Sequence, residues 1–126
     1  MPSATIYNLN ANALSQMVGG SGTDFTTAVP TYAATMSIDL ANNSSILING
    51  LASTSATATL NANTGQLLQE ASIMIKDTGG VTITFGTNFK SAGTVNPTTG
   101  KTITVFFQFN GTNWVETGRN ASAVTH

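Results

Sequence analysis

The chain has no cysteine, and among its 126 residues it has only four basic and five acidic side chains. The absence of cysteine excludes disulfide bonds, thiolate metal sites and cysteine nucleophiles. Four basic side chains are too few to follow a phosphate backbone, so we expect no nucleic-acid partner. A net charge of -1 leaves little repulsion between copies, which suits a permanent assembly better than a free monomer.

Long apolar runs are also absent. No stretch approaches the roughly 18 apolar residues of a membrane-spanning helix, so we expect no membrane partner. Residues 1–5 lack the basic start and apolar centre of a signal peptide. We therefore expect synthesis in a host cytoplasm without an export signal.

Thr, Asn, Ser, Ala and Gly take the place of the missing charges, and several segments alternate between apolar and polar residues. The clearest alternation covers residues 32–40, 71–76, 81–85 and 101–109. Alternation with period two and many β-branched residues predict strands. We count about eight or nine short strands at intervals near ten residues, which predicts an all-β antiparallel sandwich, jelly roll or small barrel. No long internal repeat is visible.

Turn signals divide these strands. Asn42-Asn43, Asn49-Gly50, residues 77–80 and Asn110-Gly111 combine residue types that favour tight turns. We expect residues 77–80 and Asn110-Gly111 to close two hairpins, which together form the core.

The segment before Thr23 differs in pattern from the rest. Residues 4–9 read as a strand, and Asn12 can cap a short helix that carries Leu14 and Met17 on one face. A glycine-rich run follows at residues 19–23. We predict an N-terminal arm over residues 1–22 and a β domain over residues 23–126.

Candidate catalytic groups are few. Asp77-Thr78-Gly79 matches the aspartic-protease triplet, but its place between two predicted strands favours a turn. His126 is the only histidine and ends the chain, where a triad or metal site rarely has support. Glu70 and Glu116, or Asp39 with either of them, form a glycosidase pair only if folding brings them together, and solvated strand-end charges are the simpler interpretation. We expect no catalytic, cofactor or metal site, no enzymatic activity and no small-molecule substrate.

Residues 65–119 resemble a β module that recurs in structural proteins of tailed bacteriophages, including tail fibres and head-decorating proteins. The residues that carry the resemblance are Gly65-Gln66, Ile73-Met-Ile-Lys-Asp-Thr-Gly-Gly-Val-Thr-Ile-Thr-Phe-Gly-Thr-Asn-Phe-Lys90, Gly93-Thr-Val-Asn-Pro97 and Phe109-Asn-Gly-Thr-Asn-Trp114. Thr104 and Asn110 stand where similar modules often have Asp. The resemblance implies a non-enzymatic virion component.

The expected function is that of a capsid decoration, or cement, protein on the virion surface. A homotrimer would bind the major capsid protein and stabilise the shell. The alternative is a tail-fibre, spike or head-fibre domain that binds a host surface through residues 61–65 and 91–100. We expect Phe106 to be a ring on the face opposite the inward Phe107. We expect Trp114 to be a core, interface or stacking ring, and the apolar arm residues to contact the capsid. The expected partner-binding residues are Ile6, Tyr7, Leu9, Leu14, Met17, Phe106, Trp114 and Arg119.

Overall fold

The computed structural model describes residues 26–120 and 123–126, and in these ranges the chain is all-β. The arm predicted over residues 1–22, with its strand, helix and hinge, lies outside the described residues. The strands are β1 (Thr27–Ala28), β2 (Thr35–Ile38), β3 (Ser45–Gly50), β4 (Thr57–Ala62), β5 (Glu70–Asp77), β6 (Thr82–Phe85), β7 (Phe89–Lys90), β8 (Lys101–Phe109), β9 (Trp114–Arg119) and β10 (Val124–Thr125).

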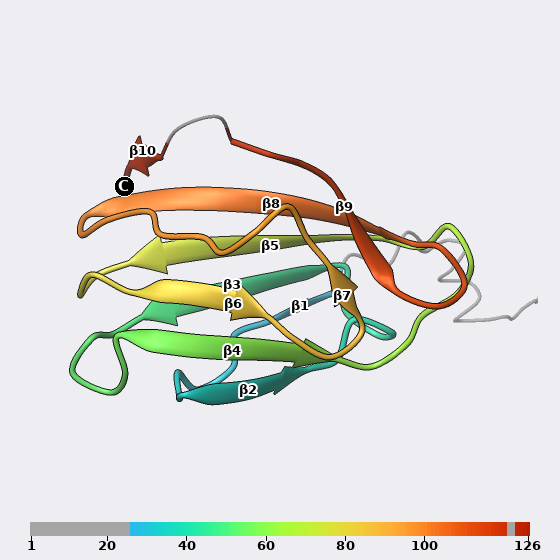
Figure 1. Cartoon of the computed structure of the whole chain (residues 1–126), viewed down its shortest axis with the longest axis horizontal. Coiled ribbons are helices and arrows are strands. Elements are labelled where there is room, and N and C mark those ends of the chain that lie inside the picture. Colours follow the sequence, from blue (N-terminus) through green and yellow to red (C-terminus); the bar gives the residue numbers. More distant parts are fainter. Residues whose placement is uncertain (1–25, 121–122) are drawn as a thin grey trace, which may run out of the picture.

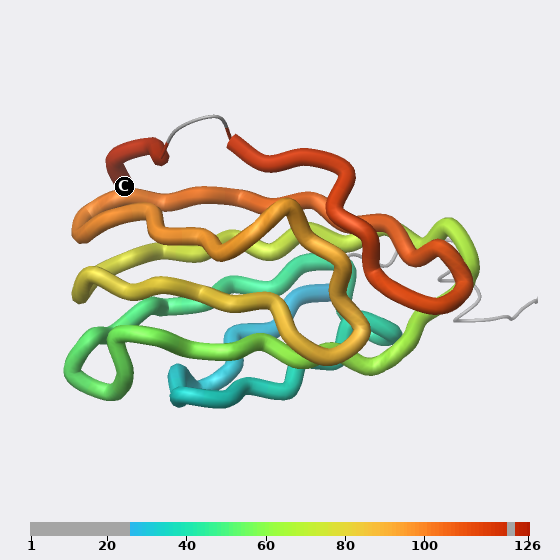
Figure 2. Tube along the Cα trace, in the orientation of Figure 1, coloured from blue at the N-terminus to red at the C-terminus, as the bar shows by residue number. Residues whose placement is uncertain are grey.

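The chain winds as a β-solenoid of about three turns (Figures 1 and 2). One sheet has the order β2-β4-β6, with every pair parallel. We call the other sheet A; it has the order β1-β3-β5-β8-β9-β7, and β1, β3 and β5 are also parallel. The predicted antiparallel sandwich, jelly roll or barrel is therefore wrong. From β1 to β7, consecutive strands alternate between the two sheets instead of pairing with each other.

The solenoid contains a structural repeat that the sequence does not display. In the smaller sheet, Thr35 pairs with Thr59, and Thr57 pairs with Thr82. In sheet A, Ser45 pairs with Ser72. The sequence separation between stacked positions thus changes from one pair of strands to the next. We call the parallel turns of the solenoid, formed by β1 to β6, the coils. Because the coils differ in length and share only their alternation of inward and outward residues, the repeat exists in the backbone and is not visible as a repeat of residues.

Of the two turns predicted to close hairpins, one forms a corner of the solenoid and the other closes a hairpin. Residues 77–80 follow β5 in sheet A and lead to β6 in the other sheet, so the first predicted hairpin does not exist. Gly50 ends β3 and is needed for packing, because a Cβ atom there would lie 2.5 Å from the Val81 side chain. Asn110-Gly111 does close a hairpin, since β8 and β9 pair antiparallel around it.

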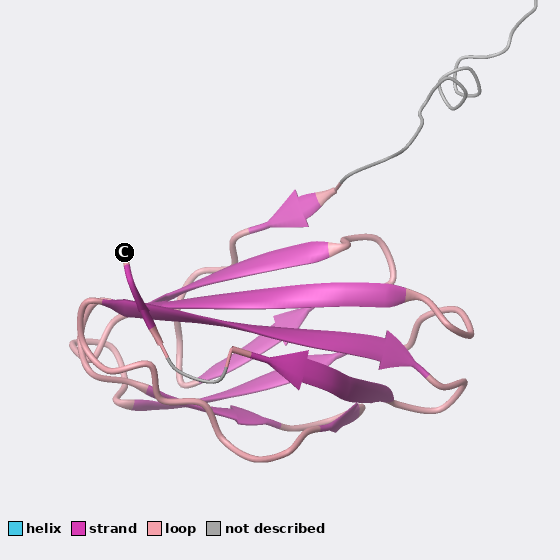
Figure 3. Ribbon diagram, turned by 90° about the horizontal axis from the view of Figure 1, so that it is seen from above, coloured by secondary structure: helices cyan, strands magenta, loops and turns pink. Residues whose placement is uncertain are grey.

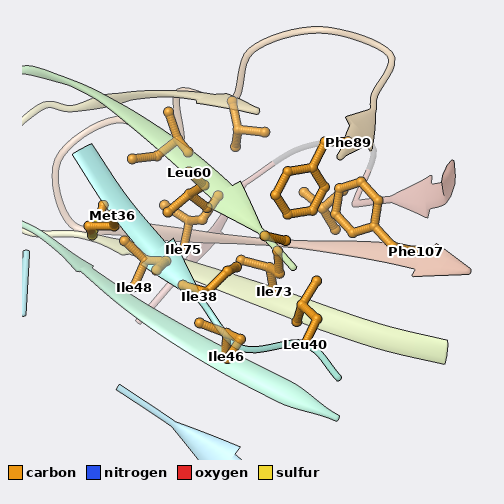
Figure 4. Close-up of a cluster of buried hydrophobic side chains, with 14 of the residues drawn as sticks. Met36, Ile38, Leu40, Ile46, Ile48, Leu60, Ile73, Ile75, Phe89 and Phe107 are labelled. Atoms are coloured by element: carbon orange, nitrogen blue, oxygen red, sulfur yellow. The ribbon is translucent and has the colours of Figure 1, made fainter. Parts of the chain in front are cut away.

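The core is the single layer of side chains between the two sheets (Figure 4). Alternation sends every second residue inward, as the sequence predicts, and each buried aliphatic side chain contributes about 1.5–3 kcal/mol through burial. The two layers of strands are seen from above in Figure 3. Fully buried aliphatic residues in the coils are Leu40, Ile48, Leu60, Ile73, Ile75, Val81 and Ile83.

The last part of the chain closes one end of the stack. Strand β8 pairs with β5 in the antiparallel direction, and β9 and β10 then pair with β8. Three rings, Phe85, Phe89 and Phe107, pack with centroids 5.0–5.1 Å apart. We call β7 to β10 the cap, because β8, which runs antiparallel to β5, ends the parallel stacking in sheet A.

Candidate functional site

Among the described residues there is no group of three or more His, Cys, Asp or Glu that could hold a metal ion. Asp77 is fully buried, and its carboxylate accepts hydrogen bonds at 2.5–2.8 Å from the backbone N–H groups of Gly79, Gly80 and Val81. The Asp77 triplet is thus a corner turn, as interpreted from its residue types. Both carboxylate oxygens are occupied by backbone donors.

The other charged candidates also have structural partners. Glu116 forms an ion pair with Arg119 at 2.7 Å, and its Oε1 accepts a hydrogen bond from the Ala92 backbone N–H. Arg119 also donates to the backbone carbonyls of Gly93 and Thr94. Hydrogen bonding from the Arg119 guanidinium lowers the pKa of Glu116, although partial burial opposes that effect. This pair fastens residues 92–94 to β9, and it leaves both oxygens of the Glu116 carboxylate occupied.

His126 lies beside β8, where its Nδ1 is 3.0 Å from the hydroxyl of Thr102. No described acidic side chain joins that contact, so the geometry of a catalytic triad is not assembled there.

The surface offers apolar groups in place of reactive ones. Three side chains from adjacent strands lie on the outer face of sheet A: Leu47 of β3, Met74 of β5 and Phe106 of β8. Met74 is 46% exposed and Phe106 is 48% exposed. Leu47 pairs directly with Met74, and Phe106 lies opposite Ser72. We call Leu47, Met74 and Phe106 the outer patch.

A shallow hollow of about 550 Å³ lies next to the outer patch. Phe106 forms part of its wall, and Gly118 lies opposite Phe106 across the β8–β9 pair with open space where a Cβ atom would be. The register between β8 and β9 shifts at this point, between Phe106 and Phe107. The ring therefore stands beside free space and is not covered by the neighbouring strand. The hollow is lined by Ser44, Ser45, Glu70, Ala71, Ser72, Phe106, Phe107, Gln108 and Thr117.

A second apolar feature is the turn of residues 66–69, which precedes β5. Leu67 is 68% exposed and Leu68 is 63% exposed. The backbone of Leu68 has a φ of 67°, which is unfavourable for a residue with a large side chain. We call residues 66–69 the leucine turn.

Hydrogen bonds hold the leucine turn in place despite that strain. The Leu68 N–H donates to the Phe109 carbonyl at 2.7 Å, and the Gln69 N–H donates to the Gln66 carbonyl at 2.9 Å. The Gln69 side chain accepts from the Gln66 N–H and donates to the Leu40 carbonyl. The two leucines are therefore presented on a braced backbone.

The expected partner-binding residues fall in four different situations. Phe106 lies on the outer face, as the alternation predicts. Trp114 is fully buried, and its indole N–H donates to the Asn63 carbonyl at 2.7 Å, so it has no surface to offer a partner. Arg119 holds the loop of residues 92–94. The arm residues Ile6, Tyr7, Leu9, Leu14 and Met17 lie outside the described residues.

Sequence reasoning missed Leu67, Leu68 and Met74 as surface groups. Met74 had a signal, because it occupies the polar phase of the alternation between Ile73 and Ile75. Leu67 and Leu68 lie between a predicted loop and a predicted strand. The sequence is therefore equally consistent with a loop and with the start of a strand at these two residues. Only the pairing of β5 with β8 places them at an exposed corner.

No family model and no curated protein matches this chain. Two solved structures are similar at a low level. The first, described as the structure of a chaperone-substrate complex, is 21% identical, with a TM-score of 0.42 over 71% of this chain and 18% of that chain. The second, the crystal structure of enterohemorrhagic E. coli StcE(132-251), is 16% identical, with a TM-score of 0.39 over 77% of this chain and 98% of that chain. This chain thus spans less than a fifth of the length of the first structure.

None of the described residues belongs to a helix long and apolar enough to cross a membrane.

Proposed function

We propose that this chain is a capsid decoration protein, a non-enzymatic component that binds the major capsid protein on the outside of a virion and stabilises the shell. The observation that carries the proposal is the leucine turn. Two large apolar side chains are exposed on a backbone that hydrogen bonds fix in a strained conformation. A surface built in this way suits insertion into a partner.

The energetics favour such a contact. A left-handed backbone conformation at a residue with a Cβ atom costs about 1–2 kcal/mol, which the fold supplies in advance through its hydrogen bonds. Burying two leucine side chains in a partner returns about 1.5–3 kcal/mol for each. Because the turn is already ordered, binding loses little conformational entropy there. A contact of this strength repeated over a shell raises the resistance of the shell by mass action.

The resemblance of residues 65–119 to phage structural modules supplies the identity of the partner in this proposal. The hydrogen bonding of Asp77 and Glu116 supports the non-enzymatic part, since backbone donors and Arg119 occupy these carboxylates. The low charge of the chain agrees with permanent attachment to a large assembly.

The first test is the copy number of this protein in purified particles, relative to the major capsid protein. We expect a ratio on the order of one copy for each capsid subunit. A few copies in each particle would support a fibre, spike or connector instead, and absence from particles would overturn the virion assignment.

The second test changes the leucine turn. Replacing Leu67 and Leu68 with Ser should lower binding to undecorated particles at least tenfold, because about 1.4 kcal/mol corresponds to tenfold in affinity. Leu51 is the matched control, since it is also exposed, at 42%, and follows β3 at the opposite end of the coils (Figure 1). Leu51→Ser should leave binding unchanged. Equal losses from both changes would show that the leucine turn is not a specific contact.

A further inference from the structure

The charges on the outer face of sheet A are arranged so that two copies of this face can set opposite charges against each other. Strand β5 runs across the middle of this face and presents Glu70, Ser72, Met74 and Lys76 outward. Neither Glu70 nor Lys76 forms an ion pair within the described part of the chain. The two opposite charges therefore flank the apolar centre of the face without a partner.

Reversing the direction of one face over another pairs these charges. A two-fold axis between two copies, running across the strands, places β5 of one copy antiparallel over β5 of the other. Glu70 of each copy then lies opposite Lys76 of the other copy, because both residues are three positions from Ile73. The separation between Glu70 and Lys76 spans about 20 Å of strand, so the two ion pairs bracket the apolar centre.

The same rotation gives the large side chains room. Phe106 is level with Ser72, and Met74 is level with Thr104. After the reversal, each Phe106 lies over Thr104 of the other copy, and each Met74 lies over Ser72. Large side chains thus lie over small ones. This arrangement suits the spacing of about 10 Å between sheets that pack face to face.

We propose that the outer face of sheet A is a homodimer interface, in which two copies pack face to face about a two-fold axis across β5. Phe106, Met74 and Leu47 form its apolar centre, and Glu70 pairs with Lys76 at both ends. A centre depleted of charge with charged pairs at the rim is the usual composition of such interfaces. This two-fold dimer takes the place of the homotrimer expected for a decoration protein, and it does not depend on the capsid proposal.

The decisive experiment is a charge exchange in the full chain, with the mass in solution measured by sedimentation equilibrium. The unmodified protein should be a dimer. Glu70→Lys alone and Lys76→Glu alone each set like charges against each other at both ends, so each should weaken dimerisation at least tenfold. The double variant restores opposite charges and should recover the dimer. Lys90→Glu makes the same change of charge on β7, the edge strand of sheet A that β8 and β9 separate from β5, and should leave the dimer intact.

Phe106→Ser tests the apolar centre and should also weaken the dimer at least tenfold. Circular dichroism and thermal unfolding confirm that each variant is folded, as expected for changes of surface side chains. A monomer at all concentrations or a trimer in the unmodified protein would overturn the proposal. Failure of the folded double variant to recover the dimer would overturn it equally.

Discussion

The parallel coils and the cap solve the same packing problem with different residues. The coils fill their interior mainly with Ile, Leu, Val and Ala, together with Tyr32 and Met36, whereas the cap and the last coil strand contribute Phe85, Phe89, Phe107, Phe109 and Trp114. Both regions show the same inward and outward alternation. The two regions differ in the size of their inward side chains, and this size depends on which part of the core each region covers.

In sheet A, aliphatic residues of one coil lie on aliphatic residues of the next coil. Ile46 pairs with Ile73, and Ile48 pairs with Ile75, so aliphatic side chains stack in register. In the smaller sheet no strand follows β6 among the described residues, and the rings of the cap help to cover that end of the core. Large rings cover that end with few residues, because each buries about 150–250 Å². Repeat proteins need such distinct terminal elements.

The comparison predicts that the largest loss of stability follows from removing a ring of the cap. Trp114 is fully buried, packs against Phe109 at 5.1 Å and donates its indole N–H to Asn63, which lies just beyond β4. Gly65 accommodates the ring closely, since a Cβ atom there would lie 2.6 Å from it. Trp114→Ala should lower the free energy of unfolding by about 3–5 kcal/mol, measured by denaturant titration.

Phe106→Ala is the matched control, because it removes a ring from the outer face of the same hairpin. Its cost should stay within about 0.5 kcal/mol when unfolding is measured at low protein concentration. Similar losses from the two variants would mean that the cap is not held by its buried rings.

The second prediction compares two corners of the coils. Asp77 is buried and accepts three backbone hydrogen bonds, whereas Asp39 is exposed and accepts its bonds from Asn42 and Asn63. An amide has only one acceptor oxygen, so Asp77→Asn leaves at least one buried N–H without an acceptor. The change should cost about 1–3 kcal/mol in the free energy of unfolding.

Asp39→Asn should cost less than Asp77→Asn, since water replaces the lost bonds at an exposed corner. Thermal unfolding of the two variants side by side measures the difference. Equal shifts in Tm would show that burial of the Asp77 corner does not contribute.

Much of the strand pattern could be predicted from sequence, but the way in which the strands pair could not. Alternation correctly sends Ile73, Ile75 and Val105 inward and Phe106 outward. A strand buried on one face shows the same alternation in a parallel coil and in an antiparallel hairpin. Asp-Thr-Gly-Gly and Asn-Gly are both turn signals, yet the first makes a corner and the second a hairpin. The distinction depends on which strand lies alongside, and that information is not local.

The candidate surfaces divide in the same way. The exposure of Phe106 follows from alternation alone, so it could be predicted. The burial of Trp114 follows from its contact with Asn63, 51 positions away, and no short-range pattern indicates it. The leucine turn is exposed because β5 and β8 end together at that corner. The misses at Trp114 and the leucine turn thus come from tertiary contacts, and the success at Phe106 comes from a local period.

The smallest predicted effect concerns the attachment of a loop to the cap. Hydrogen bonding to Arg119 lowers the pKa of Glu116 below its ordinary value of 4.5. A carboxylate whose pKa is lowered by folding contributes stability above its unfolded pKa, and that contribution disappears as the pH falls through the folded pKa. The free energy difference between the unmodified protein and Glu116→Gln should therefore be greatest near pH 7, at up to about 1 kcal/mol for a partly exposed pair. It should shrink as the pH falls below about 4.5.

A double-mutant cycle with Arg119→Gln isolates the pair, because the coupling energy should follow the same pH course. A coupling energy of zero at pH 7 would mean that the Glu116–Arg119 pair does not hold residues 92–94 on β9, so this loop would not be attached to the cap through the pair.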